Sequence, residues 1–307
     1  MKAYSAIAIA AVMILLPLET ISAFTISVSG DNANSGQRPL SEGCQLYGEE
    51  AFTSDSGNTR YTDEQVYSGD GALKLTIEQG SKGFGSLGGI IDFASCDHVG
   101  GRVLKKGDEV WVRVHIFFPQ NFEFNRNGRN KFLRLRTFSG SGNSEGYNDL
   151  YLDGRLDSTP YDYIFEGVQR WYAMGEQEHL FPLGQWRTVE YYLRLDDRTE
   201  PQGGNARVRV WIDGELIGDT GERANLVTPD SYIESLYFFT YWDNDGAHKT
   251  QSFYVDDLVV TSDTPENRDA NGFPFIGLGK PTSGSGSGGS GGSGDAPRPL
   301  PPVLTVD

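Results

Sequence analysis

Strict alternation of apolar and polar residues in several short segments is the feature that most constrains the fold of this chain. Residues 111–118 read WVRVHIFF and residues 188–195 read TVEYYLRL. Related segments occur at 131–138, 207–213, 235–242 and 253–261. A repeat of two places successive side chains on opposite faces, which is typical of a β-strand with one buried face. Asp213-Gly214 then provides a hairpin signal. We therefore predict an all-β chain.

Many antiparallel strands in one domain can bury their apolar faces only in two packed sheets or in a closed barrel. We predict a jelly-roll β-sandwich in which one sheet is curved and presents an open concave face. No segment has the long 3.6-residue periodicity of an amphipathic helix.

Both ends of the chain are predicted to lie outside this domain. Residues 1–23 combine Lys2, a short apolar run and the small residue Ala23, which is the order of a secretory signal peptide. The run is shorter than the roughly 20 residues that span a bilayer, although an N-terminal anchor is the alternative. Residues 281–307 form a Gly/Ser linker and a Pro-rich tail. We expect one domain over 24–280 and a secreted, extracellular or periplasmic protein without a membrane span.

The balance of charges restricts the partners of the protein. The chain has 42 Asp and Glu against 26 Lys and Arg, a net charge of −16. Such a protein repels nucleic acid and anionic membranes, so we expect neither as a partner, and we expect a monomer. The two cysteines are Cys44 and Cys96, and export makes a disulfide between them the prediction.

Five segments resemble concanavalin A-like jelly rolls, and most of all the secreted bacterial polysaccharide lyases of that superfamily and their uncharacterised relatives. They are VYSGDGALKLTIEQG (66–80), GDEVWVRVHIFFPQNFEF (107–124), GQWRTVEYYLRLD (184–196), VWIDGELIGDT (210–220) and FYVDDLVVTSDTP (253–265). The alginate lyase motifs Q-[IV]-H and Y-F-K-A-G are absent, as is the E-x-D-x-x-E of jelly-roll glucanases. The resemblance implies a concave face that binds polysaccharide.

A lyase acting on uronic acids needs a cation for the carboxylate, a base for the proton alpha to it and an acid for the leaving oxygen. The polar strand faces supply such residues, and the predicted catalytic set is His115, Arg134, Arg136 and Tyr192. If neighbouring strands align these faces, they form a basic, aromatic groove with further substrate-binding residues Trp111, Arg113 and Lys131. The alternation places Lys131 on the face of Leu133. The alternative is an ordinary solvent-facing sheet.

The aromatic-rich stretch 143–179 predicts a second set of substrate-binding residues. Aromatic faces stack on sugar rings, and amides and Arg side chains hold hydroxyls and carboxylates. The set is Asn148, Tyr151, Gln169, Arg170, Trp171 and His179, with Tyr241 at the rim. The alternative is a loop that closes over the sandwich around its own small core.

Asp256 is the candidate metal ligand. The resemblance implies that an Asp at this place, with backbone oxygens, holds a structural Ca²⁺, and the alternative is that its charge protects a sheet edge. No cofactor is expected for catalysis.

The leading functional prediction is a polysaccharide lyase that cleaves an anionic, uronic-acid-containing polysaccharide by β-elimination. Two alternatives stay open. The first is a non-catalytic, lectin-like protein that binds carbohydrate in the same groove. The second is a glycoside hydrolase, for which Glu190 is the attractive carboxylate but has no evident partner.

Overall fold

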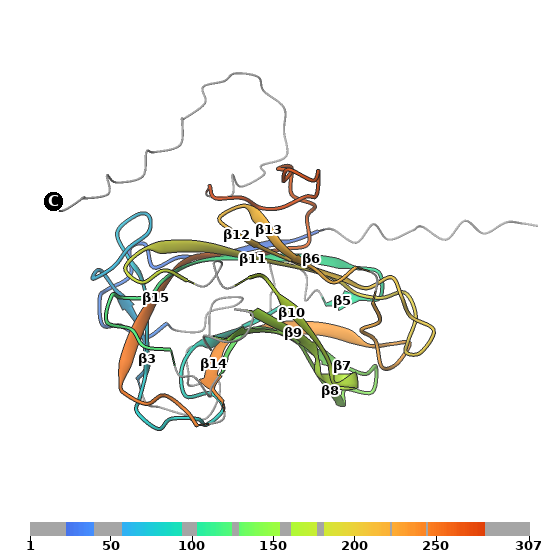
Figure 1. Ribbon diagram of the computed structural model, residues 1–307, viewed down its shortest axis with the longest axis horizontal. Coiled ribbons are helices and arrows are strands. Elements are labelled where there is room, and N and C mark those ends of the chain that lie inside the picture. The colour runs from blue at the N-terminus through green and yellow to red at the C-terminus, as the bar shows by residue number, and fades with distance from the viewer. Residues whose placement is uncertain are drawn as a thin grey trace, which may run out of the picture.

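The computed structural model describes residues 23–39, 57–93, 103–124, 129–153, 161–176, 181–221, 223–243 and 245–279. Within these ranges two antiparallel β-sheets pack face to face, and the predicted all-β jelly-roll sandwich is confirmed (Figure 1). A short 3-10 helix, η3 (Glu166–Val168), lies among the strands. None of the helices in this part of the chain has the length and apolar character needed to cross a bilayer.

One layer, the outer sheet, has eight strands in the described ranges. They are β1 (Thr25–Val28), β2 (Thr59–Thr62), β3 (Ala72–Ile77), β6 (Glu109–Phe117), β11 (Trp186–Arg194), β12 (Arg207–Ile212), β13 (Glu215–Asp219) and β15 (Gln251–Thr261). The order is β13-β12-β11-β6-β15-β3-β2, and β1 pairs with β15. The strands predicted at 111–118, 188–195, 207–213 and 253–261 therefore all lie in this sheet.

The second layer, the arched sheet, has seven strands in the described ranges. They are β4 (Gly89–Asp92), β5 (Leu104–Lys105), β7 (Arg129–Phe138), β8 (Ser144–Asp153), β9 (Tyr161–Phe165), β10 (Arg170–Met174) and β14 (Tyr232–Trp242). The order is β10-β9-β8-β7-β14-β4, and β5 pairs with β14. This sheet curves so that its concave face points away from the outer sheet (Figure 1). The stretch 143–179 contributes β8, β9 and β10 to it instead of a closing loop.

The core lies between the two layers and uses one face of each strand. Val112, Val114 and Ile116 of β6 are fully buried there, together with Leu133 and Leu135 of β7. Burying a side chain of this size stabilises the fold by roughly 1.5–3 kcal/mol. The opposite face of each sheet points away from this core.

A β-bulge in β7 interrupts the alternation. The ladder between β7 and β8 skips Phe132, which lies between Lys131 and Leu133. Phe132 points into the core, where its ring centroid is 4.7 Å from that of Phe239. The extra residue turns Lys131 onto the concave face with Arg134, which corrects the prediction that Lys131 shares the face of Leu133.

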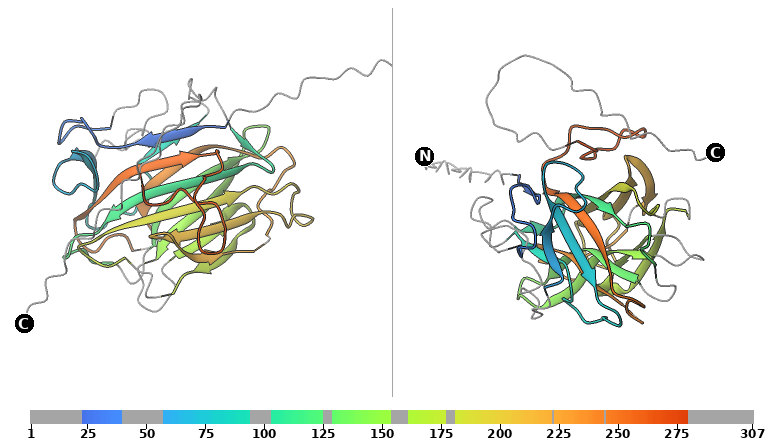
Figure 2. Two further views of the ribbon diagram at one scale, coloured as in Figure 1. Left: turned by 90° about the horizontal axis from the view of Figure 1, so that it is seen from above. Right: turned by 90° about the vertical axis from the view of Figure 1, so that its left-hand side faces the viewer.

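Residues 263–279, the C-terminal segment, cross the outward face of the outer sheet (Figure 2). The Trp111 indole N–H donates to the carbonyl of Pro274 at 3.1 Å. The Trp211 indole N–H donates to the Asp269 carboxylate at 2.8 Å. The face above β6, β11 and β12 is therefore covered by protein.

Candidate active site

The structure divides the predicted catalytic residues between the two sheets. Strand β6 pairs with β11 and β15, whereas β7 pairs with β8 and β14. The polar faces of β6 and β7 therefore point in opposite directions, away from the shared core. The outer face carries Trp111, Arg113, His115 and Tyr192, and the concave face carries Lys131, Arg134 and Arg136. The polar faces of β6 and β7 therefore do not form the single groove that the sequence predicts.

The predicted residues of the outer face are buried and bind the protein's own chain. Arg113 donates hydrogen bonds to the carbonyls of Gly277 at 3.0 Å and Asp257 at 3.3 Å, and to that of Gly279. The Tyr192 hydroxyl donates to the Glu109 carboxylate at 2.7 Å. A polymer has no access to side chains enclosed in this way.

Glu190, the carboxylate considered for a hydrolase, belongs to the same enclosed region. It accepts the backbone N–H of Gly277 at 3.1 Å and that of Ile276. Burial raises the pKa of Glu190 to about 7, although the two N–H groups and Arg113 act in the opposite direction. Glu190 thus helps to hold the C-terminal segment on the outer sheet.

His115 lies beneath the ring of Tyr67, with the two ring centroids 3.7 Å apart. Its Nδ1 is 2.8 Å from the Thr188 hydroxyl. Burial, together with the charge of Arg113, lowers the pKa of His115 to about 3. The imidazole is therefore neutral in the folded protein at any ordinary pH.

This neutral histidine predicts a pH-dependent stability. The unfolded chain binds a proton at His115 below about pH 6.5, whereas the folded chain does so only below about pH 3. The free energy of unfolding should therefore fall as the pH is lowered through this window, by up to about 1.4 kcal/mol per pH unit. Urea unfolding at pH 7, 5.5 and 4.5 should show a shallower loss for His115→Gln than for the unmodified protein. Equal slopes would contradict the buried neutral state.

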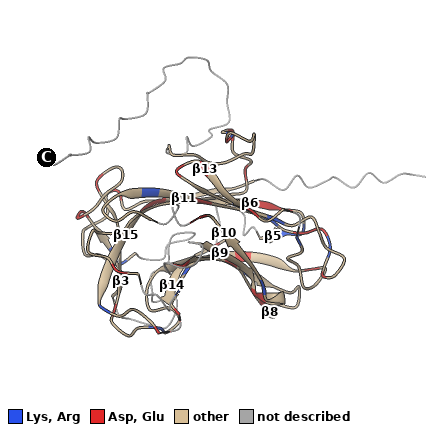
Figure 3. Ribbon diagram, viewed as in Figure 1, with Lys and Arg blue, Asp and Glu red and all other residues tan. Residues whose placement is uncertain are grey.

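The concave face carries the second group of charged residues. Arg134 of β7 donates to Asp149 of β8 at 2.8 Å and to Glu166 of η3 at 3.3 Å. The Lys131 ammonium lies 3.8 Å from Asp149 and 3.7 Å from Glu166, beyond hydrogen-bond distance. The two carboxylates hold Lys131 and Arg134 close together. Neither carboxylate accepts a hydrogen bond from the Lys131 nitrogen at these distances. Figure 3 shows basic and acidic segments on this arched sheet.

Tyrosine rings pack against these cations. The Lys131 nitrogen is 3.8 Å from the ring centroid of Tyr151 and 5.6 Å from that of Tyr241. The Arg134 guanidinium carbon is 3.8 Å from the ring of Tyr147. A cation over an aromatic face is stabilised electrostatically. The site is thus a cluster of cations and phenols on the concave face, where Lys131 and Arg134 are nearly buried and Arg136, Tyr147 and Tyr241 are partly exposed.

Burial shifts the proton affinities in this cluster. It lowers the pKa of Lys131, with Asp149 acting in the opposite direction. It raises the pKa of Tyr147 to about 12, and it raises the pKa of Tyr241 while the Arg134 charge opposes the shift. A lysine with a lowered pKa and a phenol that keeps its proton suit a base and an acid.

No protein-family model and no curated protein matches the chain. Solved structures do match. The alginate lyase Aly36B is 15% identical, with a TM-score of 0.49 over 77% of this chain and 96% of that chain. The endo-β-1,4-glucuronan lyase from the fungus Trichoderma reesei is 12% identical, with a TM-score of 0.48 over 75% and 98%. The marine PL-14 alginate lyase from Aplysia kurodai is 13% identical, with a TM-score of 0.47 over 66% and 86%. Such lyases are what the sequence segments resemble.

The remaining predicted binding residues divide into two groups. Tyr151, Trp171 and Tyr241 join the cation cluster, and the ring centroids of Tyr151 and Trp171 are 5.4 Å apart. Asn148 instead points into the core, where it donates to Thr137 at 3.1 Å and accepts from Tyr163 at 2.6 Å. The binding role predicted for Asn148 is thus corrected, because its amide is enclosed.

Gln169 and Arg170 also turn away from the cluster. The Gln169 amide donates to the backbone carbonyl of Glu166 at 2.8 Å. Arg170 forms an ion pair with Glu200 at 2.6 Å. His179, Cys44 and Cys96 lie outside the described residues, so the roles predicted for them stay predictions.

Asp256 does not fit a calcium ion. One carboxylate oxygen accepts the backbone N–H groups of Tyr67 and Ser68, at 3.0 and 3.1 Å. The other accepts the N–H of Asp257 at 2.8 Å. Oxygens surrounded by N–H donors are poorly placed for a cation. The described residues also contain no group of three or more His, Cys, Asp and Glu that could hold a metal.

Glu166 and Phe84 are concave-face residues that sequence reasoning missed. Glu166 lies on η3, outside any alternating segment. Phe84 is 47% exposed, with its ring centroid 6.0 Å from that of Tyr241. Its signal was an aromatic residue between Gly83 and Gly85 in a loop.

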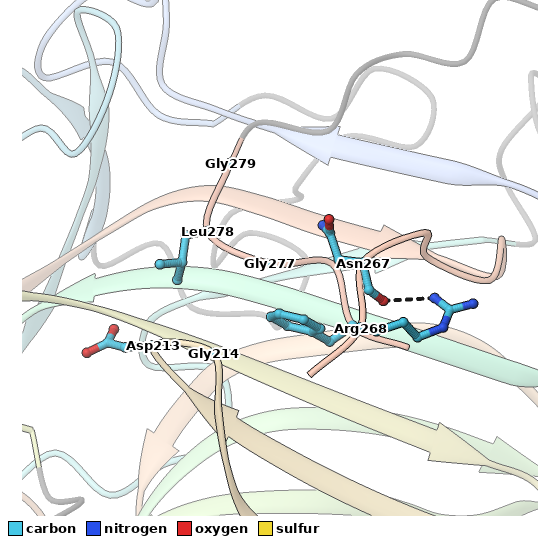
Figure 4. Close-up of a pocket in the computed structure, with 8 residues that line it drawn as sticks. Asp213, Gly214, Asn267, Arg268, Gly277, Leu278 and Gly279 are labelled. Atoms are coloured by element: carbon cyan, nitrogen blue, oxygen red, sulfur yellow. Dashed lines mark hydrogen bonds between the residues drawn. The ribbon is translucent and has the colours of Figure 1, made fainter. Parts of the chain in front are cut away.

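A separate hollow of about 560 Å³ lies on the other side of the molecule, between the β12–β13 turn and the C-terminal segment (Figure 4). Its polar side chains are already engaged. Asp213 pairs with Arg187, Asn267 donates to the Ile276 carbonyl, and Arg268 donates to neighbouring carbonyls. The concave face is therefore the stronger candidate site.

Proposed function

We propose that this protein is a polysaccharide lyase that cleaves a uronic-acid-containing polysaccharide by β-elimination on the concave face of the arched sheet. The observation that carries the proposal is the cluster of Lys131, Arg134 and Arg136 with tyrosines on the concave face, at which Arg136 and Tyr241 are partly exposed. The protein as a whole has a net charge of −16. An acidic protein can attract a polyanion where it concentrates its cations.

Arg136 supplies the charge that neutralises the uronate carboxylate. Arg134, whose three guanidinium nitrogens donate to Asp149, Thr240 and Glu166, adds positive charge behind it. Arg136 is half-buried and donates to the Tyr237 hydroxyl at 2.6 Å, which orients the guanidinium on the concave face. Arg134 is held from behind by Asp149. Guanidinium groups bind carboxylates in a two-pronged geometry. Neutralising the carboxylate makes the adjacent C–H bond more acidic and stabilises the carbanion character that develops there.

Lys131 and Tyr241 carry the proton transfers. Lys131, in the deprotonated form that its burial favours, takes the proton alpha to the carboxylate, and the electrons of that C–H bond form a carbon–carbon double bond. The bond to the glycosidic oxygen breaks, and the Tyr241 phenol gives its proton to that oxygen. The products are an unsaturated uronate and a new reducing end. Proton exchange with water restores both groups.

The two carboxylates of the cluster argue against a hydrolase. Asp149 and Glu166 both form ion pairs with Arg134. Asp149 is also fully buried, so it has no access to a glycosidic oxygen. A glycoside hydrolase needs one of its two carboxyl groups to carry a proton for the leaving oxygen. The arrangement suits carboxylates that position cations.

Incubation with a panel of uronans and neutral glucans tests the proposal. We expect an ultraviolet-absorbing unsaturated product from a uronan, and we expect Tyr241→Phe to lower kcat by about 10²- to 10⁴-fold with little change in KM. Tyr192→Phe, on the outer face, is the matched control and should keep its activity. New reducing ends without the chromophore would indicate a hydrolase, and binding without either product a lectin-like protein. Either result would refute the lyase.

A further inference from the structure

Two large aromatic side chains are exposed on the concave side of the molecule. Trp171 of β10 is 43% exposed, and Phe84, in the loop before β4, is 47% exposed. Single exposed apolar residues are common on protein surfaces, but these two flank a cluster of cations and phenols. The distances between these two side chains and the cluster determine whether one bound ligand can contact all of them.

A continuous series of contacts joins the two aromatics through the candidate base. The ring centroid of Trp171 is 5.4 Å from that of Tyr151, which lies 3.8 Å from the Lys131 nitrogen. That nitrogen is 5.6 Å from the ring of Tyr241, which is 6.0 Å from the ring of Phe84. The series crosses the arched sheet from β10 through β8 and β7 to β14. With neighbouring strands about 4.8 Å apart, it spans about 20 Å, the length of several sugar units.

Both aromatics are held in place. The Arg129 guanidinium carbon lies 4.5 Å from the centroid of the Trp171 ring. The loop that carries Phe84 is fixed by the Gly85 N–H, which donates to the Thr240 carbonyl at 3.0 Å, and by the Gly80 N–H, which donates to the Ala247 carbonyl at 2.7 Å. Rigid aromatic faces bind ligands at a low cost in conformational entropy.

We propose that Trp171 and Phe84 are stacking platforms for two sugar rings of one polysaccharide chain, at the two ends of the groove. The chain then crosses the strands, and Lys131 acts on a linkage between the platforms. The bound polymer extends past the reacting linkage on both sides, so cleavage is internal. This inference rests on the proposed function for the reaction, but the platforms need only a sugar chain.

Kinetics of platform variants test the inference. Trp171→Ala and Phe84→Ala should each raise KM for a long uronan about tenfold and leave kcat within about twofold. Phe84→Tyr should restore the KM because it restores a ring. Leu278→Ala is the matched control, since Leu278 is 48% exposed on the C-terminal segment, and its KM should not change. Early products should be of intermediate length.

Substrate length provides the sharper comparison. On a long uronan the effects of the two substitutions should multiply in the double variant. A uronate trisaccharide is too short to reach both platforms. On this substrate the KM of the double variant should be no higher than the larger of the two KM values of the single variants. Multiplied effects on the trisaccharide, or unchanged KM values on the polymer, would overturn the inference.

Calorimetry separates this inference from the proposed function. Binding of a long uronan is measured with Lys131→Met alone and with each platform substitution added. Weaker binding in the combined variants supports the platforms, even if the unmodified protein makes no unsaturated product. If the unmodified protein cleaves the uronan but binding does not depend on Trp171 or Phe84, the lyase proposal is supported and the stacking platforms are refuted.

Discussion

Lys131→Met should lower kcat on a uronan by about a thousandfold. The side chain supplies the base in the proposed reaction, and a general base contributes about 10²- to 10⁴-fold. Methionine keeps a similar length and fills the space against Tyr151 and Tyr241, so the fold should persist. Initial rates of ultraviolet-absorbing product, with a thermal melt of each protein, measure both expectations.

The substitution Lys131→Arg tests whether Lys131 acts as a base or only supplies a positive charge. Arginine keeps the positive charge between Asp149 and Glu166 but cannot lose its proton at ordinary pH. If Lys131 is the base, the arginine variant should bind the polymer and still lose turnover. Lys74→Met is the control, because Lys74 lies on the outer sheet and pairs with Glu64 at 2.7 Å. Full activity of Lys131→Arg would show that only charge is needed there.

Arg113→Met should produce the largest loss of stability. Arg113 is fully buried and donates to carbonyls of Asp257 and of the C-terminal segment. The substitution leaves those carbonyls and the nearby Glu190 carboxylate without their cation. Removing one member of a buried charged pair costs about 3–5 kcal/mol, which corresponds to a fall in Tm of about 10 °C. Differential scanning calorimetry measures the shift.

The matched control for this stability test is Arg207→Met on the same sheet. Arg207 pairs with Asp219 at 2.7 Å near the surface, and such pairs contribute about 0–1 kcal/mol. Activity per folded molecule should survive in Arg113→Met, because Arg113 faces away from the groove. A stable but inactive Arg113→Met would mean that the outer face takes part in the reaction.

The fold could be predicted from the sequence because alternation is a local property. A segment such as residues 111–118 shows by itself which side chains of β6 face the core. It does not show that the opposite face of β6 is buried as well. Even the hairpin at Asp213-Gly214 joins the expected strands, β12 and β13. Two packed layers then follow from the need to bury one face of each strand.

The site was only partly predictable, because alternation does not say which sheet a strand joins. Arg134 and His115 both stand on polar faces, and only the strand order separates them by the thickness of the core. The bulge at Phe132 was also invisible, since an extra apolar residue beside Leu133 looks like an ordinary strand end. Tyr147, Asp149 and Tyr151 alternate with Asn148 and Leu150, so this part of the concave face could have been found from the sequence.

The position of the C-terminal segment also determines on which side of the molecule a label or a solid support can be attached. The carbonyl of its last described residue, Gly279, accepts a hydrogen bond from Arg113 on the outer sheet, on the side opposite the concave face (Figure 1). A label, a solid support or a second protein joined after this residue would therefore start from the back of the sandwich. Immobilised in that orientation, the protein would present its groove outward, and a long polymer could approach it without meeting the support.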